Sequence, residues 1–352
     1  MAAIILHTDE SAGYGWNVVR RSWSGTQFDL PGGEDAQLAV KSWLTEASVR
    51  RLCALGGLDL DTLIAAAHRR DFVPIPLGVH TSLSFDVAVD TVATANIVGV
   101  LPGSDPALRD EAVILSAHHD HLGLGAPDST GDRIHHGAVD NAAGCAQVLA
   151  IATEFAKTPP HPARSIVALF VAGEEQGLLG SQYYAAHPTV PLARIAADIN
   201  FDGGNVLGRT ADVAVIGKGK SDLEDRLVVA ARTQQRTVVD EPEPDKGYYY
   251  RSDQLSFARV GVPALYFKSG QTYLGRPAGW GQAMDAEYRR LRYHQPADRI
   301  EPGWDLSGMV EDAHLGYLVG LEVANGAKRP AWFPGDEFEA VRLRSLGASG
   351  AK

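Results

Sequence analysis

The densest group of chemically competent side chains is His118, His119, Asp120 and His121, in AHHDHLG, directly after an apolar run. Imidazole nitrogens bind divalent metal ions, and a carboxylate can orient a ligating imidazole. In an extended backbone His118 and Asp120 point to one side, whereas His119 and His121 point to the other. The spacing therefore favours His118 as a ligand whose ring Asp120 holds, and packing or outer-shell roles for His119 and His121.

Four further motifs carry carboxylates or imidazole at the ends of expected elements: Asp140 in GAVDNAAG, Glu174 and Glu175 in GEEQGLLGS, Asp202 in INFDG, and His294 in YHQPADRIE. Two imidazoles and three or four carboxylates, without a thiolate, suit two adjacent Zn²⁺-like ions better than a structural zinc site. A water held between two ions is a nucleophile at neutral pH and needs a free carboxylate to take its proton. In the Glu174–Glu175 pair, one residue can bind metal while the other stays free.

Alternating strands and helices must position these motifs. Short apolar segments predict strands at residues 111–117, 165–173, 194–202, 211–217 and 262–267. The spacing of apolar residues predicts helices over residues 141–157, 221–235 (Ser221 as N-cap) and 305–325, with Val148, Ala152 and Phe155 on one face. This order predicts an α/β fold, a three-layer α/β/α sandwich around a mostly parallel, mixed sheet.

The N-terminal part of the chain has a different composition. A strand near the start is followed by expected helices over residues 36–57 and 60–71, and residues 73–100 have the β-branched pattern of strands. We expect three parts: a small N-terminal region (1–72), a catalytic domain (73–326) and a peripheral tail (327–352).

Composition excludes several classes of protein. The 352 residues carry a formal net charge of -11, which argues against nucleic-acid or anionic-membrane partners. No apolar run has the length of a transmembrane helix, and the first residues make a poor signal peptide. Cys53 and Cys145 are the only cysteines, so a disulfide framework is excluded and each is expected to be a small buried residue.

The five motifs, in this order, resemble the co-catalytic zinc aminopeptidase family, which includes glutamate carboxypeptidase II, transferrin receptor and glutaminyl cyclase. The resemblance covers roughly residues 90–325 and includes GYYYRSDQLSFARVGVPALYF. It implies two zinc ions per chain and assigns a role to each of the following residues: His118 and Asp202 bind one zinc, Glu175 and His294 bind the other, Asp140 bridges them, Glu174 is the general base, Asp120 holds the His118 ring, and Tyr293 polarises the scissile carbonyl.

Residues 1–72 resemble the latter part of a protease-associated domain, found in larger members of this family that are usually exported. The chain opens in the middle of that pattern, which indicates either a shortened protein or a missing start. The cellular compartment and the oligomeric state therefore stay open.

The function expected from the resemblance is release of N-terminal residues from peptides with a free amine, because an acidic cleft favours a cationic amine. A carboxypeptidase or dipeptidase is the alternative, with Arg251 available to grip a carboxylate. A glutaminyl cyclase is disfavoured because the full two-metal ligand set is present. A non-catalytic receptor-like module on the same fold is disfavoured because Glu174 and all five ligand positions are intact.

Other polar residues have plainer interpretations. His135 and His136 are expected to be solvated loop histidines, although both could line the cleft. Asp253 is expected to cap a helix. Tyr248, Tyr249 and Tyr250 either pack in the core or line a substrate pocket, and the sequence favours neither.

Overall fold

The computed structural model of the chain describes residues 2–31, 38 and 40–350. The chain divides into two compact units, the first drawn from residues 1–20 and 31–93 and the second from residues 21–30 and 94–352. No helix in the described ranges is long and apolar enough to cross a lipid bilayer. The three-part division expected from the sequence stays a prediction.

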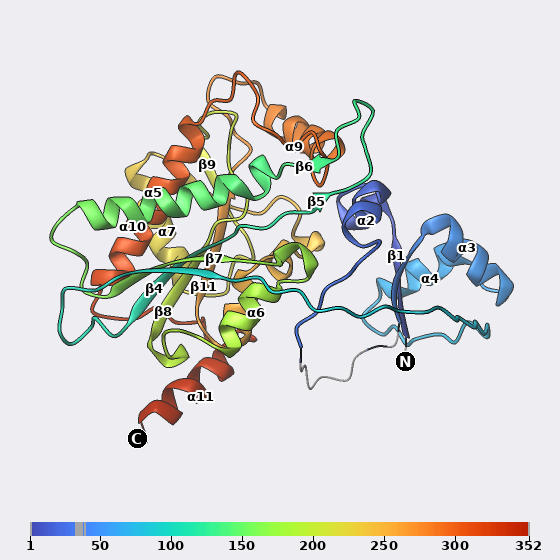
Figure 1. Cartoon of the computed structure of the whole chain (residues 1–352), viewed down its shortest axis with the longest axis horizontal. Helices are drawn as coiled ribbons and strands as arrows, with labels where there is room; N and C mark the ends of the chain where they lie inside the picture. The colour runs from blue at the N-terminus through green and yellow to red at the C-terminus, as the bar shows by residue number, and fades with distance from the viewer. Residues whose placement is uncertain (1, 32–37, 39, 351–352) are drawn as a thin grey trace. The chain divides into compact units, whose positions relative to one another are not determined.

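The first unit contains a two-stranded parallel ribbon with short helices (Figure 1). Its elements follow the chain in this order: β1 Ala2–His7, α1 Asp9–Ala12, α2 Trp16–Ser22, β2 Val40–Thr45, α3 Glu46–Leu55 and α4 Leu60–Ala67. The early strand and the helix after residue 59 are confirmed. Helix α2 begins in the first unit, and its last two residues belong to the second.

The helix expected over residues 36–57 is wrong in its first half. Residues 40–45 form β2, because their backbone pairs in register with β1 along its whole length. The helix begins only at Glu46, where the Thr45 hydroxyl accepts a hydrogen bond from the Ser48 amide and caps the first turn. Residues 36, 37 and 39 of the expected helix lie outside the described residues. Cys53 is buried, as expected.

The strands expected between residues 73 and 100 are also mostly wrong. Residues 73–96 contain neither helix nor strand, and only β3, Ile97–Leu101, forms at the end of this segment. A strand needs a partner for its backbone groups, and β3 finds one in an antiparallel pairing with β7, Ser165–Val171. The β-branched pattern of the preceding residues has no such partner among the described residues.

A seven-stranded sheet forms the centre of the second unit, in the order β10-β9-β11-β8-β4-β7-β3. Its remaining strands are β4 Ala112–His118, β8 Ile195–Asn200, β9 Asp212–Val215, β10 Thr237–Asp240 and β11 Ala264–Ser269. Strands β3 and β9 run antiparallel to their neighbours β7 and β11, and the other pairings are parallel. The predicted mixed, mostly parallel sheet is confirmed. A separate ribbon pairs β5 Gly123–Leu124 with β6 Ile134–His135.

Helices cover both faces of this sheet, as the α/β/α prediction requires (Figure 1). The helices are α5 Ala143–Lys157, α6 Leu179–Ala186, α7 Leu223–Thr233, α8 Gln254–Arg259, α9 Trp280–Leu291, α10 Ser307–Asn325 and α11 Glu339–Gly350. Shorter helical turns lie at Ala138–Ala142, Glu174–Gln176, Leu192–Arg194, Pro244–Lys246 and Tyr248–Arg251. The cap of α7 is Asp222 rather than Ser221, and its side chain makes no capping hydrogen bond.

Alternation along β4 divides the core between the two faces. Val113 and Leu115 belong to the cluster that contains Val148 and Phe155 of α5, and Ala152 packs against that cluster, as predicted. Ile114 joins the opposite cluster, with residues of α6 and α8. All seven residues of β4 are buried, because both faces of the strand are covered.

The C-terminal residues also contribute to the core. Trp332 and Phe338 are buried in a third cluster with Tyr249, and the Arg342 guanidinium donates to the backbone oxygen of Ile195 at the start of β8.

The registers place three parallel strand ends at one edge of the sheet. His118 at the end of β4 lies opposite Val171 of β7, and Ser116 lies opposite Asn200 of β8. The loops that carry the acidic motifs after β7 and β8 therefore start beside His118. In open α/β sheets, ligands bind at this carboxyl edge.

Candidate metal centre

The first group of ligand atoms forms around the end of β4. His118 is 1% exposed, and its Nε2 lies 3.2 Å from Asp140 Oδ1 and 3.7 Å from Asp202 Oδ1. Nε2 is buried without a hydrogen-bond partner among the described residues. A buried, unpartnered nitrogen facing two carboxylates is the arrangement that a metal ion satisfies.

The second group forms on the other side of Asp140. His294 Nε2 lies 3.2 Å from Asp140 Oδ2 and 3.2 Å from Glu175 Oε2. The two oxygens of Asp140 thus face one imidazole each, which is the geometry of a bridging carboxylate. The structure brings together all five ligand positions expected from the sequence.

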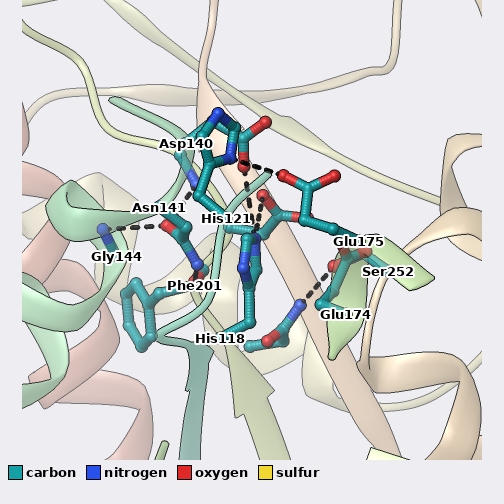
Figure 2. A network of polar contacts seen from close by, with 12 residues as sticks. His118, His121, Asp140, Asn141, Gly144, Glu174, Glu175, Phe201 and Ser252 are labelled. Carbon is teal, nitrogen blue, oxygen red and sulfur yellow. Dashed lines mark hydrogen bonds and ion pairs between the residues drawn. The ribbon is translucent and has the colours of Figure 1, made fainter. Parts of the chain in front are cut away.

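A tight turn between β6 and α5 presents Asp140 (Figure 2). The Asn141 side chain donates to the Phe201 backbone oxygen and accepts from the amides of Gly144 and Gly203. A side chain at Gly144 would collide with Asn141 and with the Phe201 carbonyl, which explains the glycine at the end of GAVDNAAG. The turn that holds Asp140 is therefore fastened to the loop after β8.

Asp298 fastens the same turn from another direction. Its carboxylate oxygens accept hydrogen bonds from the amides of Val139 (3.1 and 3.2 Å) and Asp140 (3.1 Å), and its backbone oxygen accepts from Ala138. Asp298 is 1% exposed and follows His294 by four positions. One buried residue thus couples the segment of the last ligand to that of the bridging ligand.

Asp120 fixes the turn that carries the adjacent glutamates, Glu174 and Glu175. Its carboxylate accepts from the amides of Glu174 (3.1 Å) and Glu175 (3.4 Å). The His118 ring bonds through Nδ1 to the backbone oxygen of Asp120 at 3.1 Å, whereas the carboxylate oxygen lies 3.7 Å away. The backbone of Asp120 therefore supplies the direct hydrogen bond to His118, and its side chain acts mainly on the glutamate turn.

The protonation of this cluster depends on burial and on crowded like charges. Burial, with repulsion from Glu175, Asp202 and Asp253, raises the pKa of Glu174 well above its usual value, although the charge of His118 opposes the rise. Burial also raises the pKa of Glu175 to about 8. Burial opposes ionisation of Asp140, but the close contacts and charges of His118 and His294 outweigh it and hold its pKa well below the usual range.

His118 responds in the opposite sense to the carboxylates. Burial disfavours its imidazolium, but the charge of Glu174 and contacts with Asp120, Asp140 and Asp202 raise its pKa well above the ordinary value. Divalent cations would replace that proton and relieve the repulsion among the carboxylates. The donor set of two imidazoles and three carboxylates fits zinc.

His121 enters the site in the outer-shell role that the sequence analysis allowed, although it does not point away as the alternation rule predicted. Its Nδ1 lies 2.7 Å from Glu175 Oε1, and its ring meets that of His294 edge-on. The alternation rule applies only to extended backbone, and β4 ends at His118. His121 can also form a metal-binding group with Asp140 and Glu175. His119 lies outside, exposed and bonded to the Ala95 backbone oxygen.

The neighbouring histidines differ from each other. His135 is buried, which corrects the expectation of a solvated loop residue, because its ring packs against Gly125 and lies beside the His121 ring. His136 keeps substantial exposure and pairs with Asp132 at 3.0 Å. Cys145 is half-buried against the main core cluster and donates to the His118 backbone oxygen, and burial raises the pKa of its thiol to about 11.

Asp253 is fully buried at the start of α8 but makes no capping hydrogen bond, so the capping role is wrong. Burial raises its pKa to about 7. Tyr249 packs in the third core cluster, whereas Tyr248 accepts from Arg289 and Tyr250 donates to Glu337. The three tyrosines therefore have structural contacts of their own.

Tyr293 lies against the ligand cluster. Burial and the charges of Asp140 and Glu175 raise the pKa of its hydroxyl well above the ordinary value, while the positive charge of Arg251 opposes the rise. Its ring centroid is 4.0 Å from that of His294.

Sequence reasoning missed two supporting residues: Asp298, and Ser22, which bonds to His294. It allowed an outer-shell role for His121 but did not name Glu175 as its partner. The motif YHQPADRIE contained Asp298, so a carboxylate four residues after a ligand was a usable signal. Nothing in the sequence marked Ser22.

Several curated proteins are similar in sequence to part of this chain. A probable zinc metalloprotease of Pyricularia oryzae is 37% identical over 185 residues, which cover 52% of this chain and 31% of the relative. Leupeptin-inactivating enzyme 1 of Streptomyces exfoliatus is 25% identical over 209 residues, or 58% of this chain and 43% of that protein. The chain spans less than half the length of the curated relatives that it matches.

Solved structures of similar fold include the LapA aminopeptidase of Legionella pneumophila, at 19% identity and a TM-score of 0.49, covering 66% of this chain and 56% of that one. BSAP, a zinc aminopeptidase from Bacillus subtilis, has 20% identity and a TM-score of 0.48, covering 66% and 51%. The family model described as Peptidase family M28 matches residues 96–318, which is more than half of the chain. The chain therefore belongs to peptidase family M28.

Proposed function

We propose that this chain is an aminopeptidase that uses two zinc ions, held by His118, Asp140, Glu175, Asp202 and His294. The observation that carries the proposal is Asp140, whose two oxygens each lie 3.2 Å from a different buried imidazole. Bound there, the ions would supply a water of lowered pKa and polarise the peptide carbonyl.

Glu174 is the residue suited to move the proton. Its carboxylate makes no hydrogen bond with any described residue, it keeps partial exposure to solvent, and its raised pKa suits a group that both takes and returns a proton. It would take the proton of the attacking water and pass it to the leaving amine. Asp120 fixes the Glu174 backbone for this task.

Tyr293 would donate a hydrogen bond to the oxygen of the scissile carbonyl as negative charge develops there. Its raised pKa keeps the hydroxyl protonated, so that it remains a donor at neutral pH.

The charge around the cluster favours a substrate with a free amine. Beyond the ligands, Glu174, Asp120, Asp253 and Asp298 add acidic groups whose charges act on the site. An α-ammonium group is attracted to such an acidic site, and a C-terminal carboxylate is repelled. This supports removal of N-terminal residues from peptides.

A carboxypeptidase-type or dipeptidase activity is the second candidate. The observation in its favour is Arg251, whose positive charge acts on the Tyr293 hydroxyl and whose guanidinium lies 5.2 Å from the Tyr248 ring centroid. An arginine beside the carbonyl-polarising tyrosine could bind a substrate carboxylate.

A hydrolysis assay distinguishes the aminopeptidase from the carboxypeptidase or dipeptidase. It compares aminoacyl-nitroanilides with their N-blocked analogues and with dipeptides that have a free C-terminus, and uses chelator and added Zn²⁺ as controls. We expect metal-dependent cleavage of the unblocked nitroanilides. Cleavage of blocked compounds alone would exclude the aminopeptidase.

The Glu174→Gln variant should keep its metal content and lose about 10²–10⁴-fold in turnover, the contribution of a general base. Loss of metal from this variant, with turnover restored by excess Zn²⁺, would show that Glu174 and Glu175 have exchanged roles.

A further inference from the structure

Ser22 lies far from the family-matched region in sequence but contacts a proposed ligand. Its Oγ is 2.6 Å from His294 Nδ1, and the two residues are 272 positions apart in the sequence. Ser22 is 3% exposed and His294 is 7% exposed. Residues 21–30 belong to the same compact unit as residues 94–352. We propose that Ser22 is a positioning residue that orients the His294 ring for the second metal ion.

The two ring nitrogens of His294 have separate partners. Nε2 faces Asp140 and Glu175, so it is the nitrogen available to a metal ion. A neutral imidazole that ligates through Nε2 carries its proton on Nδ1, and that proton needs an acceptor. Among the described residues, the Ser22 hydroxyl is the hydrogen-bond partner of Nδ1. The serine therefore selects the tautomer that can bind metal.

The backbone of His294 makes this support more important. Its φ is +54°, a left-handed conformation that costs free energy for a residue other than glycine. A ring on such a backbone needs contacts that fix it: the ring of Tyr293 packs against it, and the ring of His121 meets it edge-on. The Ser22 hydrogen bond adds a directional contact at Nδ1.

The other ligating imidazole has a different kind of support. His118 Nδ1 bonds to the backbone oxygen of Asp120, only two residues away and inside the family-matched range. The orienting group of His294 lies outside residues 96–318. By this inference, a segment outside the matched region completes the second metal position.

The inference rests on the proposed two-zinc function, and a metal titration tests it apart from activity. Wild-type, Ser22→Ala and Ser24→Ala chains are stripped and titrated with Zn²⁺ against a chromogenic chelator, and with Co²⁺ by visible absorption. In the alanine variant at position 22, we expect the first equivalent to bind as in wild type and the second to bind about 10–100-fold more weakly. Ser24 is an exposed neighbour and should have no effect.

Further readouts separate positioning from a general loss of structure. Ser22→Thr keeps a hydroxyl and should recover the second equivalent. Turnover of Ser22→Ala should fall at limiting Zn²⁺ and return in excess. Wild-type affinity for both equivalents in Ser22→Ala, or an equal loss of both, would overturn the inference. If wild type binds fewer than two equivalents of Zn²⁺, the two-zinc proposal fails instead. If wild type binds two equivalents but does not cleave unblocked nitroanilides, only the substrate assignment fails.

Discussion

The two sides of the candidate metal centre are built differently. His118 is the last residue of β4, and Asp202 follows β8 by two positions, so the central sheet places both. Glu175 lies in a single helical turn, and His294 lies in a loop with positive φ. We call these the strand side and the loop side. Asp140 belongs to both.

The difference shows in how the ligands are supported. On the strand side, His118 is fixed by backbone pairing and by a neighbouring backbone oxygen. On the loop side, side chains from distant segments do this work: His121 holds Glu175, Ser22 holds His294, and Asp298 ties the His294 segment to the Asp140 turn. A sheet edge fixes ligands through its backbone, whereas loops need cross-links between side chains.

The shared residue should give the largest effect. Asp140→Asn leaves one carbonyl oxygen where two carboxylate oxygens faced the two imidazoles. We expect loss of both metal ions and a fall in turnover of more than about 100-fold. Replacing a residue that only supports a metal ligand costs at most roughly 100-fold. Metal analysis and nitroanilide assays measure this. Retention of one full equivalent would show that the two sides bind independently, which would break the comparison.

Removing a cross-link should weaken the loop side selectively. In Asp298→Asn, one acceptor oxygen becomes a donor that faces the amides of Val139 and Asp140. We expect metal affinity to fall about 10–100-fold, with the second equivalent more affected. The control is Asp305→Asn, the same change at an exposed helix start. Chelator competition measures both, and an effect confined to the first equivalent would contradict the assignment.

The sequence predicted the strand side of the metal centre better than the loop side. The five apolar strands and their helices were predictable because a sheet covered on both faces demands continuous apolar segments. His118 and Asp202 follow such segments, so their meeting at the carboxyl edge could be expected. Glu175 and His294 came from the ordered motifs and the family resemblance.

The errors of the sequence analysis arise where strand pairing or a turn of the chain decides the local structure. Residues 40–45 have helical spacing, yet they form a strand because β1 is beside them. His121 lies beyond the end of β4, where the chain turns and alternation fails. Ser22 meets His294 across 272 positions, and no local pattern encodes such a contact. Long-range partners therefore limit what one sequence reveals about the loop side.

Replacing a buried carboxylate that is not a ligand should have the smallest effect on metal binding and should instead change the free energy of unfolding. Asp253 is fully buried, and burial raises its pKa from 3.8 to about 7, while the charge of His118 opposes and those of Asp202 and Asp120 add to the rise. Because the folded-state pKa is raised, the protonated carboxyl of Asp253 contributes stability that is fully present below about pH 4. That contribution is lost as pH rises through about 7. In chelator, the stability gain of Asp253→Asn over wild type should therefore grow as pH rises from about 4 to about 7 and persist above that.

The gain should reach on the order of 4 kcal/mol at most, and denaturant unfolding at several pH values measures it. Asp225→Asn, on the exposed face of α7, is the matched control. Zn²⁺ should shrink the difference, because cations favour ionised carboxylates nearby. A gain that does not depend on pH would mean that Asp253 stays neutral throughout, so the strand side would carry no buried charge beyond its ligands.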